Sequence, residues 1–241
     1  MSKKQRRAVY QESQDNTIQF ERQQRYKPVQ IIPRNLKQEE YLELLNDASK
    51  LIVFSTGPAG TGKTLFAMLA GIRALREKQI SKLILTRPAV GVEGESHGFL
   101  PGDLNAKMEP WTRPLFDVIM EYFDTRTIAK MLEDRTIEIS PLAFMRGRTF
   151  KNAWIIADEM QNATPGQMKM LLTRIGDRSK IVVTGDIAQT DKREGENGLL
   201  DFKRLFKEYE GSKYVAGCEF GYRDIERHPA VAEILKIYRE E

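Results

Sequence analysis

The sequence predicts an α/β fold in which a mostly parallel sheet is covered by helices on both faces. Three observations lead to this prediction. Short apolar runs alternate with segments whose apolar residues recur at helical spacing. A glycine-rich turn joins the first apolar run to a helix, and two adjacent carboxylates follow a later run. We expect strands at residues 51–55, 82–86, 137–139, 153–157, 180–184 and 214–220.

Helical segments fill the intervals between these strands. One helix opens at Asn35 and runs towards Leu45, and another begins near Lys63. Thr164 is suited to cap a further helix because its hydroxyl can accept from the first turn, and Pro165 fits the first helical position. We expect two more helices at 108–123 and 229–238, and a glycine- and proline-rich loop at 91–103.

The turn after the first strand carries the most specific pattern in the chain, the P-loop spacing G-x-x-x-x-G-K-[ST]. Its glycines allow the backbone to wrap around a phosphate and point N–H groups inward. The N-terminus of the following helix adds positive charge. Lys63 is expected to reach the β- and γ-phosphates, and Thr64 to bind Mg²⁺. The expected ATP-binding residues here are Gly57, Pro58, Ala59, Gly60, Thr61, Gly62, Lys63, Thr64 and Leu65.

The second half of the nucleotide site follows the apolar strand 153–157. Asp158 ends this strand, and a carboxylate in that position opposite a P-loop holds Mg²⁺. The adjacent Glu159 can deprotonate an attacking water, so we assign it as the general base. Gln189 follows the 180–184 strand and is our candidate for a γ-phosphate sensor. The second carboxylate also indicates that strand 180–184 lies between strand 153–157 and the P-loop strand.

Several arginines are candidates for contacts with phosphate. Arg146 and Arg148 flank a glycine, and such a pair can grip phosphate or stabilise charge in a transition state. They could equally hold carboxylates across a surface. We favour the functional role, because the segment leads directly into the carboxylate motif. The catalytic candidates are therefore Lys63, Glu159, Gln189 and Arg148.

The basic charge of the chain belongs to its N-terminal arm. The 241 residues carry a net charge of +4. Residues 1–34 hold eight Lys or Arg against three Asp or Glu, which leaves 30 against 31 in the remainder. We expect a flexible arm at 1–34 and a single domain at 35–241. The arm either contacts nucleic acid through phosphate charge or is a solvated tail.

Composition also limits the setting and the metal chemistry. The only cysteine is Cys218, so no internal disulfide forms, which indicates a reducing cytoplasmic environment. No apolar run approaches the roughly 20 residues that span a bilayer, and the N-terminus shows no signal segment, so we expect no membrane association. Two histidines and one cysteine offer no metal cluster, so Mg²⁺ is the only metal expected.

Eight segments of the chain form a recognisable series. They are GPAGTGKT at 57–64, LTRPAV at 85–90, GFLPGDL at 98–104, PLAFMRGRTF at 141–150, DEMQN at 158–162, QMKMLLTR at 167–174, TGDIAQTD at 184–191 and RHPAV at 227–231. In this order they resemble the PhoH-like, phosphate-starvation-inducible ATPase family, from about Asn35 to Tyr238. Met160 stands where the family usually has alanine, and the loop 191–197 is unusually charged. Neither departure removes a nucleotide ligand.

The resemblance implies a P-loop NTPase of the RecA-like type with a single motor domain. More distantly, the chain is similar to the first motor domain of superfamily 1 helicases. In those enzymes a glutamine placed like Gln38 reads the base, and an amide suits adenine because it accepts and donates at once. Five residues of this chain have counterparts in those enzymes that bind or hydrolyse the nucleotide. They are Lys63, Thr64, Asp158, Glu159 and Gln189.

A single motor domain leaves a bound nucleotide open on one side. From the length of the chain, we expect neither the second motor domain of a helicase nor the additional domains of longer relatives. Water exclusion and an arginine finger then have to come from another chain. We therefore expect a ring-like homo-oligomer, such as a hexamer. The arginines that could act in trans or contact nucleic acid are Arg87, Arg146, Arg148 and Arg227.

The leading functional hypothesis is an ATP-hydrolysing protein that acts on single-stranded RNA or DNA, with RNA favoured, as a helicase-like motor. The alternative is a nucleotide-gated oligomeric scaffold with slow hydrolysis and no motor activity. A third hypothesis, a kinase for a small molecule, is less consistent with Glu159, because a water-activating carboxylate beside the metal ligand suits hydrolysis.

Overall fold

The computed structural model describes residues 28–88, 113–190, 195–226, 230 and 237. These residues contain a six-stranded sheet with the order β3-β2-β4-β5-β1-β6, and every neighbouring pair is parallel. The predicted fold class is confirmed, as is the position of β5 between β4 and β1. The strands are β1 (Ile52–Thr56), β2 (Lys82–Arg87), β3 (Ile137–Pro141), β4 (Ala153–Ala157), β5 (Lys180–Gly185) and β6 (Val215–Glu219).

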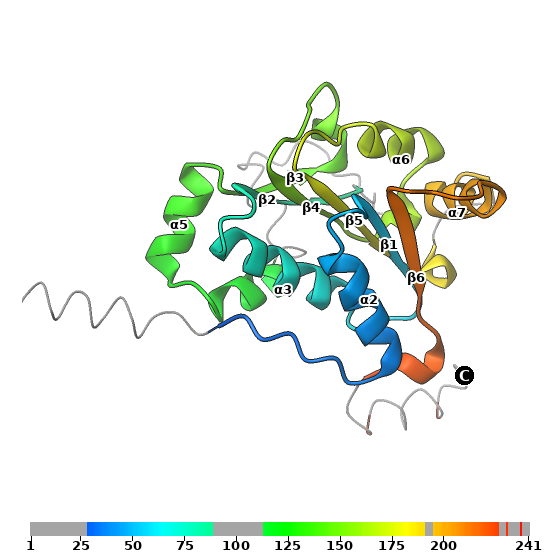
Figure 1. The fold of residues 1–241 in the computed structure, drawn as a ribbon, viewed down its shortest axis with the longest axis horizontal. Helices are drawn as coiled ribbons and strands as arrows, with labels where there is room; N and C mark the ends of the chain where they lie inside the picture. Colours follow the sequence, from blue (N-terminus) through cyan, green and yellow to red (C-terminus); the bar gives the residue numbers. More distant parts are fainter. Residues whose placement is uncertain (1–27, 89–112, 191–194, 227–229, 231–236, 238–241) are drawn as a thin grey trace, which may run out of the picture.

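Helices connect the strands (Figure 1); those that begin near Asn35, Lys63 and Pro165 were predicted, but those at 125–133 and 198–208 were not. They are α2 (Leu36–Asn46), α3 (Lys63–Arg76), α5 (Thr125–Glu133), α6 (Pro165–Leu172) and α7 (Gly198–Glu208), and residues 113–120 are also helical. Short 3-10 turns are η1 (Leu142–Met145), η2 (Met160–Asn162), η3 (Ile187–Gln189) and η4 (Tyr222–Asp224). The predicted loop 91–103 and nearly all of the predicted helix 229–238 lie outside the described residues. Among the described helices, none is long and apolar enough to cross a membrane.

The cap of α6 forms as expected from the sequence. The hydroxyl of Thr164 accepts from the backbone N–H of Gln167 at 3.2 Å, and the Gln167 side chain accepts from the Thr164 N–H at 2.9 Å. Pro165 occupies the first turn, where its missing N–H costs nothing. This reciprocal capping fixes the start of α6 directly after η2.

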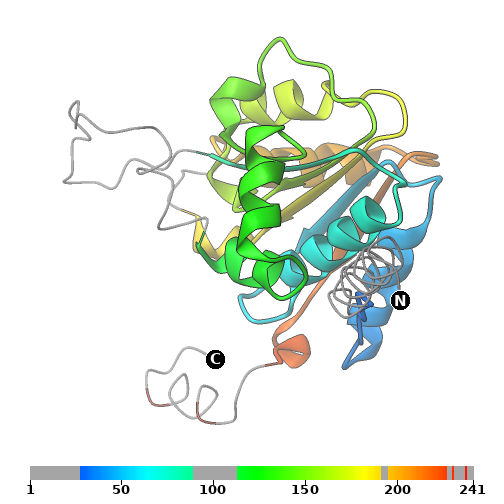
Figure 2. The same ribbon diagram turned by 90° about the vertical axis from the view of Figure 1, so that its left-hand side faces the viewer.

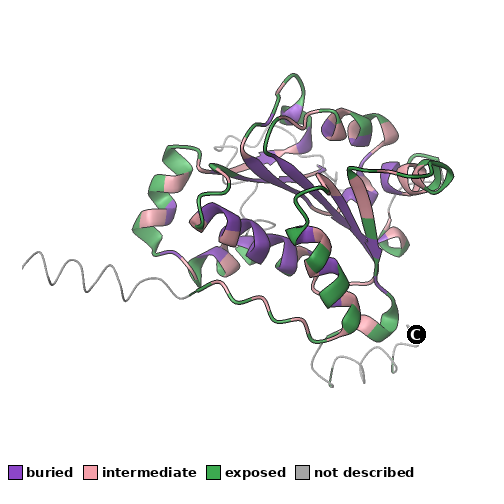
Figure 3. Cartoon of the chain, viewed as in Figure 1, coloured by how far each residue is buried: buried purple, intermediate pink, exposed green. Residues whose placement is uncertain are grey.

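Alternate residues of the central strands face two separate cores, because successive side chains of a strand point to opposite faces. One core packs against α2, α3 and α5, and the other against α6 and α7 (Figures 1 and 2). The central strands are buried on both faces (Figure 3). The first core receives Val53, Leu83, Leu85, Trp154, Ile156 and Val182, and the second receives Phe54, Ile84, Ile155, Ile181 and Val183.

The strand register brings four loops to one edge of the sheet. Thr56 at the end of β1 pairs with Gly185 at the end of β5. Thr86 near the end of β2 pairs with Ala157 at the end of β4. Because the strands are parallel, the residues that follow all four strands emerge side by side.

The end of the predicted N-terminal arm contacts the domain. Val29 and Ile31 are partly buried and pack against the first core. Residues 1–27 lie outside the described part of the chain. The boundary at residue 34 therefore stays a prediction.

A buried lysine joins α2 to the sheet. Lys180 opens β5, and its Nζ donates to the carbonyl oxygens of Leu44, Leu45 and Asp47 at 3.1, 2.7 and 2.9 Å. Burial lowers the pKa of Lys180 to about 8, so the ammonium remains protonated at pH 7 and can serve all three acceptors. These carbonyls lie at the C-terminal end of α2, where backbone acceptors lack helical partners.

Replacing this lysine should therefore destabilise the domain. We expect Lys180→Met to lower the free energy of unfolding by about 2–4 kcal/mol, because buried carbonyls lose a charged donor. Urea denaturation monitored by circular dichroism measures the change. Lys169→Met, at an exposed position of α6, is the matched control and should stay within about 0.5 kcal/mol of the wild type. Equal losses in the two variants would contradict this role of Lys180.

Candidate nucleotide-binding site

The P-loop has the backbone that its glycines predict. Gly57, Gly60 and Gly62 have φ values of 135°, 86° and 86°, in the region that side chains disfavour. Gly57 is restricted a second time, since a Cβ there would lie 2.3 Å from the carbonyl oxygen of Phe220. Gly62 precedes α3, so the loop runs directly into the positive end of that helix. This arrangement can direct backbone N–H groups at an anion.

Lys63 places its charge within the P-loop. It is the first residue of α3, and its Nζ donates to the carbonyl oxygens of Gly57 and Pro58, each at 2.6 Å. The Thr61 hydroxyl is 3.3 Å from the same atom. The ammonium group therefore lies at the centre of the loop, where it can exchange carbonyl partners for phosphate oxygens.

Asp158 joins three elements at the edge of the sheet. Its Oδ1 accepts from the Thr64 hydroxyl of α3 at 2.8 Å and also from the Thr184 hydroxyl of β5. Its backbone N–H donates to the Thr86 carbonyl of β2 at 2.9 Å. The carboxylate is thus held by neighbours on both sides, directly opposite the P-loop. Sequence reasoning missed Thr184, which only the register identifies as a neighbour.

The facing oxygens of Thr64 and Asp158 fit a magnesium site. Both are hard ligands of the kind that Mg²⁺ prefers. Across the part of the chain that the structure describes, no group of three or more His, Cys, Asp or Glu side chains could hold a metal alone. One carboxylate and one hydroxyl are what a protein contributes when substrate phosphates and water complete the octahedron.

Glu159 has a backbone conformation that few residues other than glycine adopt. Its φ and ψ are 54° and 38°, in the left-handed region. Its Oε2 accepts from Nε2 of Gln161, and its Oε1 lies 4.0 Å from Nη2 of Arg87. About one third of the Glu159 side chain is exposed (34%). Strained backbone of this kind clusters at functional sites, where surrounding contacts maintain it.

Gln161 connects Glu159 to the loop after β5. The residue is 1% exposed. Its Oε1 accepts from the backbone N–H of Asp186 at 3.1 Å, and its carbonyl oxygen accepts from the Thr190 hydroxyl at 3.2 Å. The sequence offered no signal for this role beyond the proximity of Gln161 to the carboxylates, because burial of an amide cannot be recognised from its letter. Gln161 is therefore a residue of the site that the sequence did not reveal.

Most of the predicted nucleotide residues line one pocket of about 270 Å³, but Gln38, Gly57, Pro58 and Thr61 are not among its lining residues. The pocket lies between the P-loop and the ends of β4 and β5. Gln189, the exposed last residue of η3, lines it opposite the P-loop. The lining residues are Ala59, Gly60, Gly62, Lys63, Thr64, Leu65, Asp158, Glu159, Gly185, Asp186 and Gln189.

Gln38 braces the P-loop from α2. Its Nε2 donates to the Thr61 carbonyl at 3.1 Å, and its Oε1 accepts from the backbone N–H of Arg34 at 2.8 Å. The side chain is 2% exposed. Both ends of the amide thus bind the protein's own backbone beside the loop. Its role as an adenine reader stays a prediction.

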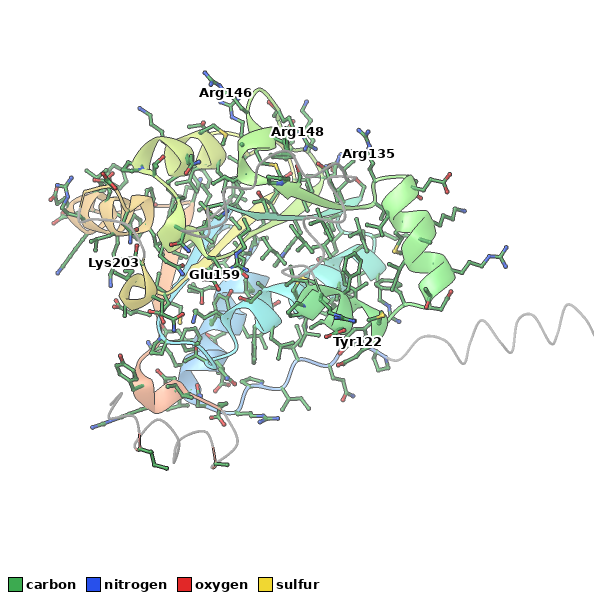
Figure 4. The ribbon with its side chains drawn as sticks, turned by 180° about the vertical axis from the view of Figure 1, so that it is seen from behind. Tyr122, Arg135, Arg146, Arg148, Glu159 and Lys203 are labelled. Atoms are coloured by element: carbon green, nitrogen blue, oxygen red, sulfur yellow. The ribbon has the colours of Figure 1, made fainter. Side chains whose placement is uncertain are left out.

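Arg146 and Arg148 do not line the pocket. The Arg148 guanidinium binds both carboxylate oxygens of Glu138 on β3, with Nη2–Oε2 at 2.8 Å, and lies 4.7 Å from the Phe150 ring centroid. This pairing keeps the pKa of Glu138 below its usual value. Figure 4 shows Arg146 and Arg148 along the upper edge of the view, with Glu159 nearer its middle. Arg227 lies outside the described residues. A role in trans for any of these arginines stays a prediction.

The fold and the pocket define a P-loop NTPase domain, and comparison with known proteins gives its family. The model of the family of PhoH-like proteins matches residues 30–239. The chain belongs to this family. A PhoH-like protein of Bacillus subtilis is 45% identical over 208 residues, covering 85% of this chain and 63% of the relative. A PhoH-like protein of Synechocystis is 44% identical over 206 residues, covering 85% and 61%. Escherichia coli Protein PhoH is 40% identical over 211 residues, covering 86% and 58%.

These relatives are longer than the matched region. The chain spans about three fifths of the length of each. Among solved structures, the Pif1 helicase from Candida albicans matches 86% of this chain and 44% of its own, with 17% identity and a TM-score of 0.40. At this identity and TM-score, the similarity does not indicate a shared function.

The left-handed conformation of Glu159 should affect the stability of variants at this position. We expect Glu159→Gly to be more stable than Glu159→Ala by about 1 kcal/mol, because only glycine adopts this backbone without strain. Thermal denaturation of both variants gives the difference. The same two substitutions at Glu208, in the last turn of α7, should give the opposite order, since alanine is favoured in a helix. A Glu159→Ala variant as stable as Glu159→Gly would show that the strain is absent.

Proposed function

We propose that this domain binds ATP with Mg²⁺ at the pocket and hydrolyses it. The observation that carries the proposal is the convergence on one pocket of a P-loop, the hydroxyl–carboxylate pair of Thr64 and Asp158, and the adjacent carboxylate of Glu159. These are the parts that phosphoryl transfer to water requires. Membership of the PhoH-like family is consistent with it.

Each residue of the pocket has a role in this proposal. The P-loop N–H groups and Lys63 bind the phosphates and stabilise their charge. Thr64 and Asp158 would hold Mg²⁺, which neutralises phosphate charge when bound. Glu159 accepts a proton from the attacking water. Gln189 lies in the loop after β5 and contacts the terminal phosphate across the pocket. The conformation of this loop therefore responds to the loss of that phosphate.

We further propose that single-stranded nucleic acid, RNA rather than DNA, is the polymer on which hydrolysis acts. Two features support this. Residues 1–34 concentrate positive charge, which suits phosphate contacts. Arg87 emerges at the same sheet edge as the pocket and is 30% exposed, so it can reach a polymer that crosses this edge. Coupling of ATP hydrolysis in the pocket to such a polymer would make the domain a helicase-like motor.

Substitutions in the pocket test the ATPase proposal. Lys63→Ala should weaken ATP binding by at least about tenfold, because a charged donor to phosphate is lost. Glu159→Gln should retain ATP binding but lower kcat by about 100-fold or more, since proton transfer to a positioned base is lost. Steady-state phosphate release and binding of a fluorescent nucleotide separate the two effects.

Matched controls for this experiment lie on exposed helical positions, namely Lys169→Ala and Glu133→Gln. Both should behave as the wild type. Hydrolysis that survives in Glu159→Gln at the wild-type rate would exclude Glu159 as the base. Phosphate transferred to a small acceptor instead of released would replace the ATPase proposal by a kinase.

The polymer proposal is tested by titrating single-stranded RNA and DNA. We expect RNA to raise the rate of ATP hydrolysis, and deletion of residues 1–27 to weaken RNA binding and reduce its dependence on salt, because fewer phosphates are neutralised. Fluorescence anisotropy at several salt concentrations measures both. Affinity unchanged by the deletion would remove the arm from the interface. Hydrolysis indifferent to either polymer would favour a nucleotide-gated scaffold.

A further inference from the structure

Arg87 stands between the proposed catalytic pocket and the outer surface. It is the last residue of β2, and the Thr86 carbonyl beside it accepts from the backbone N–H of Asp158. Its Nη2 lies 4.0 Å from Oε1 of Glu159. An arginine in this position can face either the carboxylate next to it or an anion that arrives from solvent.

Glu159 has both carboxylate oxygens directed at donors of its own chain. Oε2 accepts from Gln161, whose side chain is fixed by Asp186 and buried in the protein. Oε1 faces the guanidinium of Arg87. A base that is to receive a proton from water needs an oxygen directed at that water. The contact with Arg87 therefore competes with the proposed catalytic role of Oε1.

The two contacts differ in strength. The bond from Gln161 is a close hydrogen bond from a buried and fixed amide. The ion pair with Arg87 is long, at 4.0 Å, and about one third of each side chain is exposed. Exposed ion pairs of this kind are weak. Arginine binds a phosphate group through two parallel hydrogen bonds, which is stronger and directional. We therefore expect Arg87 to bind a phosphodiester in preference to Glu159.

We propose that Arg87 couples the two parts of the proposed function: it restrains Glu159 until a phosphodiester of single-stranded nucleic acid takes the guanidinium. Gln161 keeps the carboxylate in place when Arg87 leaves, so Oε1 turns towards water while Oε2 stays anchored. Arg87 is then a positioning residue that lowers hydrolysis without polymer. This inference rests on the ATPase and nucleic-acid binding proposed above.

The test compares Arg87→Ala with the wild type in ATP hydrolysis, with and without single-stranded polyuridine. We expect Arg87→Ala to raise the rate without RNA by up to about fivefold, the rate factor for the roughly 1 kcal/mol upper end of an exposed ion pair. Added RNA should give no further rise in this variant. The KM for ATP should stay unchanged, because the effect lies on the proton-accepting step.

Two further variants separate charge from structure. Arg87→Lys keeps the charge and should restore the restraint and part of the response to RNA. Arg126→Ala, at an exposed position of α5, is the matched control and should respond to RNA as the wild type does. Circular dichroism confirms that each variant is folded.

Two outcomes would overturn the inference. If Arg87→Ala has the wild-type rate without RNA and loses only the stimulation, Arg87 is a nucleic-acid contact without a restraining role. If a folded Arg87→Ala loses hydrolysis altogether, Arg87 serves catalysis directly. Both outcomes leave the ATPase proposal intact, because that proposal fails only if wild-type hydrolysis is absent or survives Lys63→Ala and Glu159→Gln.

Discussion

The hydrogen bond between Thr64 and Asp158 is the contact on which the site depends. Thr64 lies in the first turn of α3, after β1, whereas Asp158 follows β4, and β5 separates these two strands in the sheet. Thr184 of β5 donates to the same carboxylate, so the ends of three strands converge on one oxygen. The parallel register makes this possible, because every strand delivers its following residue to the same edge. Two buried cores fix that register from opposite faces, so the geometry of the pocket follows from the packing of the sheet.

Much of this architecture could be predicted from the sequence. The strands are near-continuous apolar runs because both faces of the sheet are covered, and this signal is strong. The position of β5 between β1 and β4 was predicted from the adjacent carboxylates that follow β4. Carboxylates opposite a P-loop indicate that one strand separates their strand from the P-loop strand. The glycines of the loop needed positive φ angles, and the structure has them. The bounds of β4 match the prediction, and the other strand ends differ from it by at most two residues, because apolar patterning does not determine where pairing stops.

The remaining features depend on contacts between distant residues, which spacing cannot reveal. Nothing in the letters around Glu159 indicates a left-handed backbone or a buried amide beside it. The sequence left open whether Arg148 faces phosphate or a carboxylate, and it did not indicate Glu138 of β3 as the partner. The contact of Gln38 with the P-loop backbone was also not expected from the sequence. The partners of Arg148 and Gln38 lie 10 and 23 positions away along the chain, and only the fold brings them close.

The central claim is that this cluster is one nucleotide site, and a crystal structure with Mg²⁺ and ADP–aluminium fluoride tests it most directly. The account predicts the nucleotide phosphates inside the P-loop, with Lys63 Nζ moved from the Gly57 and Pro58 carbonyls to phosphate and fluoride. It predicts the metal between Thr64 and Asp158, and the attacking water beside Glu159. A nucleotide bound elsewhere, or a metal held without Thr64 and Asp158, would contradict the account.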